Sequence, residues 1–379
     1  MKTEKGSFIL IEGDALDVLK AKIDADSIDL IYIDPPFNSG RNYYMALGDG
    51  GVTGQAFTDI WNNYKYKDEL EEIGALNINL YNFLINLEKS GLPTSYLSYL
   101  TMMGIRCCYM YKTLKPTGSF YYHCDDTIGH YVRIVLDYIF GIKNFRNMIT
   151  WERMQGSKST SKNYPRTSDF IFYYTKTDNY TFHAQYISVT DKTIKSYNKI
   201  DEYGRIYRLD NVMAPAGGKN DVREWNIDGK VIKHPQGKAF RWTQETLDRK
   251  RKEHFEKYGT ELIHISSNGV PRQMRYLEDS KGVMLDNIWT DINVLGSHDK
   301  ERLGYPTQKP EALIERIVLA SSNPGDKVAD FYLGSGTTAA ASIKNGRNFI
   351  GCDINPLAIE ITRKRLGKLT NGNPGLDNA

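Results

Sequence analysis

The chain has 379 residues, of which 40% are hydrophobic and 25% charged, the usage of a globular protein with a substantial core. This composition excludes disordered, collagen-like and low-complexity chains, and no apolar run reaches the roughly 18 residues of a membrane span. The four cysteines, Cys107, Cys108, Cys124 and Cys352, form no C-x-x-C pair. That pattern favours reduced thiols in a cytoplasmic protein without a bound metal.

Charge is unevenly distributed, although the formal net charge is only +3. Residues 151–300 contain 25 Lys+Arg against 20 Asp+Glu, whereas the rest of the chain contains 24 against 26. The middle of the chain is therefore its basic part. Such an excess is compatible with nucleic-acid binding and equally with a solvated surface.

Residues 1–150 alternate between strand-like and helix-like runs. We predict strands at 8–12, 27–34 and 119–124, and helices at 14–22, 97–114 and 126–140. This alternation indicates a mostly parallel sheet with helices on both faces. Residues 62–96 interrupt it, and we interpret them as a partly helical insertion that forms either a surface excursion or a lid.

The alternation of strand-like and helix-like runs returns near the C-terminus, after a polar and irregular middle region. In residues 301–379 we predict helices at 310–321, 337–345 and 356–369, and strands at 327–331 and 348–353. In residues 151–300 we predict an aromatic strand at 170–174 and a charged helix at 243–258. The two α/β parts thus flank a region of different character.

A glycine-rich turn joins the strand predicted at 327–331 to the helix predicted at 337–345. Gly334 and Gly336 permit a sharp turn and a close approach of the backbone to a ligand at the helix N-terminus. The third glycine of the dinucleotide fingerprint is absent, since Ala339 stands at that spacing. Asp353 ends the following strand, where a carboxylate can accept hydrogen bonds from both ribose hydroxyls. The pattern suits an adenosine-containing ligand with a short amino-acid-like tail at least as well as NAD.

The tetrapeptide Asp34-Pro35-Pro36-Phe37 follows a strongly apolar strand. Two prolines fix φ and remove two N–H donors, so they present one carboxylate, one carbonyl and one aromatic ring on a stiff arm. Hydrogen bonds from an exocyclic amino group to Asp34 and to the Pro35 carbonyl would favour a pyramidal, nucleophilic nitrogen. Phe37 could stack on the planar base that carries this amino group. The arm therefore indicates methyl transfer to an amino group by positioning and electrostatics.

With this tetrapeptide first and the glycine turn last, the chain resembles the β class of S-adenosyl-L-methionine-dependent DNA amino-methyltransferases. The matching segments are 12–16, 27–43, 118–126, 305–310 and 351–356. The resemblance implies a Rossmann-like methyltransferase fold with a circularly permuted motif order. It implies a catalytic half at 1–150, a target-recognition region at 151–300 and a cofactor-binding half at 301–379.

The resemblance also implies site residues. Asp34, Pro35, Pro36 and Phe37 would hold the target base. The positions that would bind the cofactor are Asp14, Ala15, Lys309, Asp330, Phe331, Gly334, Ser335, Gly336, Thr337 and Asp353. Of these, Asp14 and Ala15 would lie at the adenine, Asp353 at the ribose hydroxyls and the turn at the methionine end. Lys309 would face the cofactor carboxylate, and Asp330 either faces its ammonium group or caps the turn.

Contacts with DNA are expected from a basic, hydroxyl-rich run near the start of the middle region. It contains Arg153, Lys158, Lys162 and Arg166, which could cradle phosphates near the active site or form a solvated loop. Because the target base must leave the helix to reach Asp34, a second aromatic wall is expected. Phe172, Tyr173 and Tyr174 are candidates for it, and the sequence does not choose among them.

We therefore predict a site-specific enzyme that methylates adenine N6 in double-stranded DNA, because the family that the chain resembles tends to carry Asp at the position of Asp34 for adenine targets and Ser for cytosine N4. Cytosine N4 is the first alternative, followed by methylation of RNA or a protein amide. An NAD dehydrogenase and a DNA-binding module with a decayed cofactor site remain as further alternatives. The resemblance is compatible with a homodimer and with a cognate restriction endonuclease, and it implies a nucleoid-associated protein of prokaryotic cytoplasm.

Overall fold

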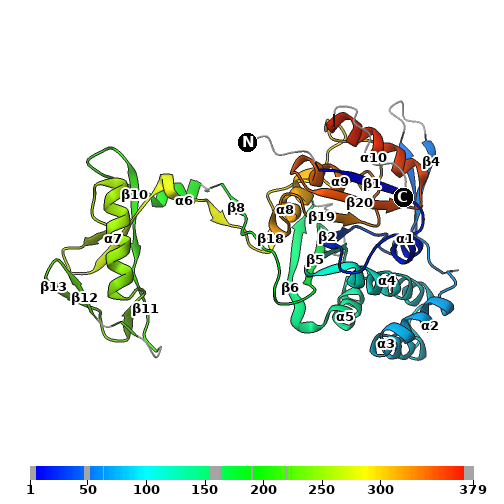
Figure 1. Ribbon diagram of the computed structural model, residues 1–379, viewed down its shortest axis with the longest axis horizontal. Coiled ribbons are helices and arrows are strands. Elements are labelled where there is room, and N and C mark those ends of the chain that lie inside the picture. Colours follow the sequence, from blue (N-terminus) through cyan, green and yellow to red (C-terminus); the bar gives the residue numbers. More distant parts are fainter. Residues whose placement is uncertain are drawn as a thin grey trace. The chain divides into compact units, whose positions relative to one another are not determined.

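The computed structural model describes residues 6–46, 52–62, 64–153, 162, 164–188, 191–217, 221–222 and 224–370. The chain forms two compact units. Unit 1 comprises residues 1–185 and 285–379, and unit 2 comprises residues 186–284 (Figure 1). Within the described residues, no helix is long and apolar enough to cross a bilayer.

Unit 1 is built on one eight-stranded sheet. In spatial order its strands are β1 (Phe8–Glu12), β20 (Asn348–Asp353), β19 (Lys327–Asp330), β2 (Ile28–Ile33), β5 (Leu114–Cys124), β7 (Ser168–Thr175), β6 (Phe145–Glu152) and β18 (Ile288–Trp289). Neighbours run parallel from β1 to β5, and β7 runs antiparallel to both β5 and β6. The predicted strands and the mostly parallel α/β fold are confirmed.

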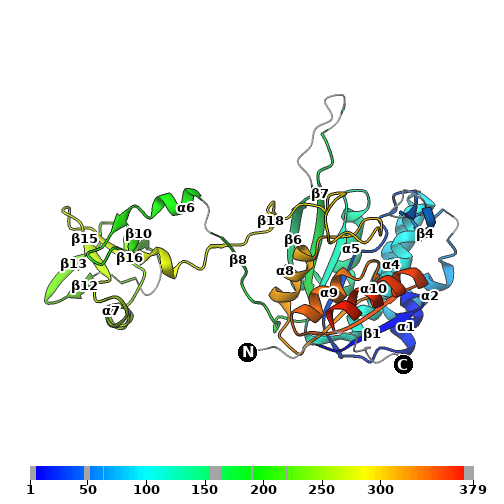
Figure 2. The same cartoon turned by 90° about the horizontal axis from the view of Figure 1, so that it is seen from above.

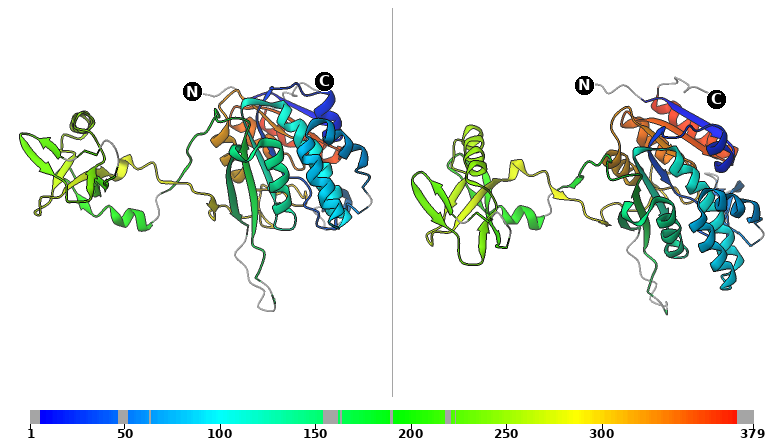
Figure 3. Two further views of the ribbon diagram at one scale, coloured as in Figure 1. Left: turned by 90° about the horizontal axis from the view of Figure 1, so that it is seen from below. Right: turned by 60° about the horizontal axis from the view of Figure 1, so that its bottom comes forward.

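Helices cover both faces of this sheet (Figures 2 and 3). One face packs against α1 (Ala15–Ala21), α4 (Thr94–Thr113) and α5 (Gly129–Phe140), and the other against α8 (Glu311–Ser321), α9 (Thr337–Lys344) and α10 (Pro356–Leu369). Side chains of β2 alternate between the two cores: Ile31 and Ile33 join the first, and Leu30 and Tyr32 the second. Burial on both faces explains why the strand is apolar at every position except Asp29.

Three strand ends determine where a site can form. Strands β2, β19 and β20 are consecutive parallel neighbours, so their carboxyl ends meet at one edge of the sheet. Asp34 follows β2, Asp330 ends β19 and Asp353 ends β20. Ligands of open α/β sheets bind outside this edge, at a switch in strand order.

The segment 62–96 contributes to the core of unit 1. It contains α2 (Lys67–Leu76) and α3 (Ile78–Lys89), and Leu70, Ile73, Leu80 and Leu84 are buried in the cluster that also includes α4. The prediction of a partly helical insertion is confirmed. The interpretation as a surface excursion is wrong for these two helices, because their apolar faces pack against α4.

Unit 2 comprises fewer residues than the target-recognition region predicted at 151–300. β6 and β7 extend the sheet of unit 1, and the fully buried Trp151 donates its indole N–H to the carbonyl of Ile292 (2.7 Å). Unit 2 itself contains a four-stranded sheet and the helix α7 (Gln244–Tyr258), close to the helix predicted at 243–258. Trp225 is a fully buried residue in the core of unit 2, and its ring stacks on Phe240 (centroids 4.0 Å apart).

The remaining strands are a hairpin beside the site in unit 1 and several short strands in unit 2. The hairpin is β3 (Asn42–Ala46) and β4 (Val52–Thr58). The four-stranded sheet consists of β15 (Ile263–Ile265), β16 (Pro271–Tyr276), β10 (Ile206–Asn211) and β9 (Lys199–Ile200). The pairs are β11 (Met213–Pro215) with β14 (Lys238–Phe240), β12 (Glu224–Ile227) with β13 (Lys230–Lys233), and β8 (Tyr186–Ile187) with β17 (Val283–Met284). The short helix α6 (Asp191–Ser196) completes unit 2.

Candidate active site

A cavity of about 540 Å³ opens at the carboxyl ends of β2, β19 and β20. This is the size of a typical small-molecule site. The predicted residues that line it are Asp14, Ala15, Asp34, Pro35, Pro36, Phe37, Lys309, Asp330, Phe331, Gly334, Ser335, Thr337 and Asp353. The tetrapeptide and the glycine turn, about 300 residues apart in sequence, therefore share one cleft.

Gly336 is the predicted residue that does not line the cavity. It precedes α9 with φ of +72°, and a Cβ there would lie 2.4 Å from the hydroxyl oxygen of Thr362 on α10. Its glycine identity is thus explained by the left-handed backbone and by the close approach of the turn to α10. The contact of Gly336 with the cofactor stays a prediction.

Asp34 is held by a residue from the other end of the chain. Lys309 donates from Nζ to Asp34 Oδ2 at 2.5 Å, and its ammonium lies 5.4 Å from the centre of the Phe37 ring. The other oxygen, Asp34 Oδ1, is buried and has no hydrogen-bond partner among the described residues. Lys309 was expected at the cofactor carboxylate, and the structure places its ammonium on Asp34 instead.

Asp330 is fully enclosed at the base of the glycine turn. It accepts hydrogen bonds from the backbone N–H of Tyr332 (2.9 Å) and the hydroxyl of Thr338 (2.6 Å). Burial raises the pKa of Asp330 to about 7, against the lowering effect of these two bonds, and the nearby Asp34 and Asp353 add to the increase. A cation bound beside this carboxyl would favour its ionised form.

Asp353 connects the end of β20 to the turn. Its Oδ2 accepts the N–H of Gly334 (2.8 Å) and its Oδ1 accepts the N–H of Asn355 (2.9 Å). Burial raises the pKa of Asp353, although both hydrogen bonds act in the opposite direction. Each oxygen keeps acceptor capacity for a further donor, as two vicinal hydroxyls would require.

Asp14 has a partner that the sequence did not reveal. It caps α1 by accepting the N–H of Leu16 (2.8 Å), and both of its oxygens accept from Arg106 Nη2 (2.9 and 3.0 Å). Arg106 lies within α4, also pairs with Glu69 (3.0 Å) and lines the cavity. Burial opposes its charge, but Tyr332, Asp14 and Glu69 outweigh burial and raise the pKa of Arg106.

A second unpredicted residue, Asp59, organises the chain after the tetrapeptide. Its buried carboxylate accepts the backbone N–H groups of Phe37 (3.1 Å), Asn38 (2.7 Å) and Ser39 (2.7 Å) and the indole N–H of Trp61 (2.9 Å). Asp59 follows β4 and lines the cavity. No local sequence signal distinguishes it from other aspartates.

The aromatic walls differ from the prediction. Phe172, Tyr173 and Tyr174 are buried in the sheet and do not line the cavity. The aromatic residues other than Phe37 that do line it are Tyr32, Tyr43, Phe57, Trp61, Tyr64, Tyr305, Phe331 and Tyr332. Side chains on a central strand pack into the core, so the walls are supplied by the hairpin, the 59–64 segment and the strand ends instead.

Behind Phe37 lies a buried histidine. The ring of Phe37 is stacked on His123 (centroids 6.0 Å apart, 19° between planes). The two ring nitrogens of His123 contact the Tyr32 hydroxyl (2.8 Å) and Asp169 (3.1 Å). Burial alone would raise the pKa of Asp169, but the contact with His123 and nearby positive charges hold it below its ordinary value.

The predicted phosphate-binding residues are partly engaged in ion pairs. Arg153 pairs with Asp169 (3.0 Å) and Arg166 with Asp126 (3.2 Å), while Lys162 is exposed. Lys158 lies outside the described residues. Arg153 is therefore engaged by the buried Asp169, whereas Lys162 and Arg166 are exposed.

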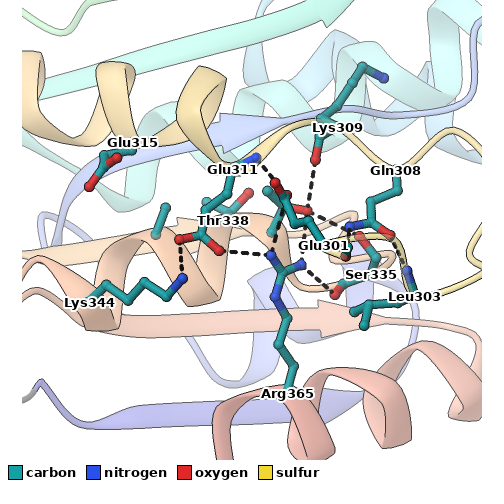
Figure 4. Close-up of polar contacts among 12 residues, drawn as sticks. Glu301, Leu303, Gln308, Lys309, Glu311, Glu315, Ser335, Thr338, Lys344 and Arg365 are labelled. Atoms are coloured by element: carbon teal, nitrogen blue, oxygen red, sulfur yellow. Dashed lines mark hydrogen bonds and ion pairs between the residues drawn. The ribbon is translucent and has the colours of Figure 1, made fainter. Parts of the chain in front are cut away.

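A network of ion pairs and hydrogen bonds around Arg365 holds the glycine turn in place (Figure 4). Arg365 of α10 pairs with Glu311 (3.0 Å) and Glu301 (3.6 Å), and it donates to the Ser335 carbonyl (3.3 Å). The Thr337 hydroxyl, which also accepts from Arg365 (3.2 Å), donates to the Lys309 carbonyl (3.3 Å). The turn and the segment that carries Lys309 are therefore tied to one guanidinium.

Comparison with known proteins gives consistent results. A family model described as DNA methylase, of the N6/N4 methyltransferase type, matches residues 28–364. The Type II methyltransferase M.EcaI of Enterobacter cloacae is 29% identical over 93% of this chain and 67% of its own length. The DNA adenine methyltransferase YhdJ of Escherichia coli K12 is 28% identical over 94% of this chain and 82% of its own. The solved M1.HpyAVI–SAM complex covers 94% of this chain and 99% of its own at 15% identity, with a TM-score of 0.42.

Proposed function

Because this chain belongs to the DNA methylase family of N6/N4 amino-methyltransferases, we propose that it methylates adenine N6 at specific sites in double-stranded DNA. One observation carries the proposal. Asp34 Oδ1 is a buried acceptor without a partner among the described residues, and it lines the cavity that the glycine turn also lines. An amino group is a donor that would satisfy it.

The target amino group would be oriented by Asp34 and by the Pro35 carbonyl. One N–H donates to Asp34 Oδ1 and the other to the carbonyl, which favours a pyramidal nitrogen with its lone pair directed into the cavity. Phe37 stacks on the base, and Lys309 holds the second Asp34 oxygen. Fixed donors and acceptors in a site shielded from water lower the barrier by positioning and electrostatics.

The residues of the cavity fit S-adenosyl-L-methionine, on which the family depends. Bound there, it would supply the methyl group for transfer. Asp353 has free acceptor capacity for two ribose hydroxyls, and Asp330 is a buried carboxyl that an ammonium group would ionise. We assign the adenine end to Asp14 and Ala15, and the methionine end to Phe331, Gly334, Ser335 and Thr337.

Adenine is proposed over cytosine for two reasons. The tetrapeptide begins with Asp34, which resembles adenine-specific members, whereas cytosine-N4 members tend to carry Ser. A relative with 82% of its length aligned, YhdJ, is named a DNA adenine methyltransferase. Both observations support N6-methyladenine as the product.

Unit 2 is proposed to recognise the target sequence, together with the exposed part of the 153–166 run. Residues 191–217 and 224–281 of this unit contain 17 Lys+Arg against 13 Asp+Glu, a mild basic excess that is compatible with DNA binding. The relative M.EcaI is named a Type II methyltransferase, which supports a restriction-modification setting. A cognate endonuclease, a homodimer and association with the nucleoid stay predictions.

Product analysis tests the proposal. The protein is expressed in a bacterial strain that lacks its own DNA methyltransferases, and the DNA is digested to nucleosides for mass spectrometry. We expect N6-methyladenine with the wild type and none with Asp34→Ala. N4-methylcytosine in place of N6-methyladenine would overturn the adenine assignment and keep the methyltransferase.

A further inference from the structure

The chain immediately after the tetrapeptide has an unusual set of hydrogen bonds. Pro35 and Pro36 have no N–H groups, so the first backbone donors after Asp34 are those of residues 37–40. All four converge on Asp59. Three reach its carboxylate, and the N–H of Gly40 reaches its carbonyl (3.0 Å).

The backbone conformation explains why four consecutive N–H groups point the same way. Asn38 has φ of +61° and Gly40 has φ of +71°, both in the left-handed region. Alternation of left-handed and ordinary residues turns successive N–H groups toward one side and forms a concavity that binds anions. Here the anion is the internal carboxylate of Asp59, of which only 1% is exposed.

The carboxylate is fully used by this concavity. Oδ1 accepts from Asn38 and from the Trp61 indole, and Oδ2 accepts from Phe37 and Ser39. An amide in place of the carboxylate would retain one acceptor oxygen and would bring its own N–H₂ group against two donors. Hydrogen bonds to a charged acceptor are stronger than neutral ones, and buried donors left without an acceptor are costly.

Asp59 is itself fixed by the hairpin that walls the cavity. Its N–H donates to the Arg41 carbonyl (2.9 Å), at the base of β3 and β4. Tyr43 of the hairpin donates from its hydroxyl to Ser39 Oγ (3.2 Å), and its ring stacks on Phe57 (4.6 Å). The anchor is therefore tied to the paired base of the hairpin, and it holds the backbone nitrogen of Phe37.

We infer that Asp59 is a positioning residue that fixes the Phe37 end of the arm, so that the ring and the Asp34 carboxylate present one geometry to the target base. The inference rests on the proposed role of the tetrapeptide in holding that base. Pro35 and Pro36 stiffen the arm because each fixes its own φ. Asp59 holds the residues that follow them by accepting hydrogen bonds from their N–H groups. The proposed cofactor residues Asp330 and Asp353 have other partners, so their binding function is separable from Asp59.

The test compares Asp59→Asn with Asp17→Asn as a matched control. Asp17→Asn makes the same chemical change at an exposed aspartate of α1 that does not line the cavity. The recognition site is first identified by sequencing DNA that the wild type has modified. Single-turnover transfer of a labelled methyl group to that DNA is then measured, together with cofactor affinity by calorimetry and the folded fraction by circular dichroism.

We expect Asp59→Asn to lower the single-turnover rate by about tenfold or more while cofactor affinity changes by less than about threefold, since about 1.4 kcal/mol of lost positioning is a tenfold change. Asp17→Asn should stay within about threefold of the wild-type rate, because exposed substitutions away from the site have small effects. A wild-type rate in Asp59→Asn would overturn the inference. So would a lower rate matched by an equal loss of cofactor binding, because that describes general unfolding.

A second variant covers the case in which Asp59→Asn does not fold. Asp59→Ala leaves the concavity empty, and sodium formate supplies a carboxylate small enough to enter it. We expect formate to restore part of the rate in Asp59→Ala and none in Asp34→Ala. Absence of recovery in folded Asp59→Ala would contradict the anion role. Failure of the wild type to methylate any base would instead refute the proposed function.

Discussion

Lys309 and Asp34, 275 residues apart in sequence, form an ion pair in which Nζ lies 2.5 Å from Oδ2. Both side chains are largely buried, with 10% and 17% of their surface exposed. The pair occupies one carboxylate oxygen and leaves the other for a substrate. It connects the segment before α8 to the tetrapeptide, so the two sequence-distant halves meet at the carboxylate proposed to hold the target base.

We predict that Lys309→Met lowers the rate of methyl transfer by about tenfold to a hundredfold, because removal of one partner leaves the Asp34 charge buried and free to reorient. Cofactor affinity should remain within about threefold of wild type, since Lys309 contacts Asp34. Single-turnover kinetics and calorimetry check both values. The exposed Lys364, which pairs with Glu360, provides the control Lys364→Met. A selective loss of cofactor affinity in Lys309→Met would restore the expectation that Lys309 faces the cofactor carboxylate.

Asp34→Ala should abolish transfer and leave cofactor binding nearly intact. The variant removes the only proposed acceptor side chain for the amino group, whereas the turn and Asp353 keep their hydrogen bonds. Measured turnover above about one hundredth of wild type would exclude Asp34 from the mechanism, because loss of a preorganised polar contact typically costs about a hundredfold or more.

Asp353→Ala is expected to weaken cofactor binding by about tenfold to a hundredfold, as the variant loses an acceptor for two hydroxyls and frees the Gly334 N–H. Calorimetry with S-adenosyl-L-methionine measures this directly. The exposed Asp17 on α1 gives the control Asp17→Ala. Equal affinities in Asp353→Ala and wild type would rule out the ribose role.

The pH dependence of stability should carry a contribution from Asp330. Its pKa in the folded protein is about 7, above the ordinary value, so the unfolded state ionises first. The folded state binds more protons between about pH 4 and 7, and stability from this group is lost as the pH rises through that window.

The variant Asp330→Asn imitates the protonated carboxyl and removes this dependence. Its stability relative to wild type should rise on going from pH 5 to pH 8, by on the order of 2–4 kcal/mol in the free protein. Urea unfolding at the two pH values checks it, with Asp17→Asn as the control. An unchanged difference between variant and wild type at both pH values would contradict a raised pKa.

Arg365→Met should lower the free energy of unfolding by about 2–4 kcal/mol, because it leaves Glu301 and Glu311 without their shared partner. Cofactor affinity should fall in parallel, since Arg365 also holds the Ser335 carbonyl (Figure 4). Denaturant unfolding and calorimetry measure the two effects. Lys364→Met, one residue away on α10 and exposed, should change both by little. Loss of stability with unaltered cofactor affinity would separate the network from the turn.

The sequence by itself determined the order and type of most elements in unit 1, although it did not reveal the β3–β4 hairpin or strands β6 and β18. Apolar periodicity predicts β2, β19 and β20, and it also indicates the acidic residues at the ends of these strands, Asp34, Asp330 and Asp353. Strand ends are readable because parallel strands buried on both faces are continuous apolar runs that stop at a polar residue or a proline. The glycine turn was readable because few residues other than glycine adopt its left-handed backbone.

Only the tertiary structure decided which side chains meet. Three contacts join residues whose local sequence gives no sign that they pair. They are the Arg106–Asp14 ion pair, the Lys309–Asp34 ion pair and the hydrogen bond from the Phe37 N–H to Asp59. The boundaries of unit 2 and the aromatic walls of the cavity also came from packing, since β6 and β7 pair with the main sheet and bury Phe172 to Tyr174. Periodicity reports which face of an element is buried, but an ion pair or a hydrogen bond depends on distances between elements that are set when the whole chain folds.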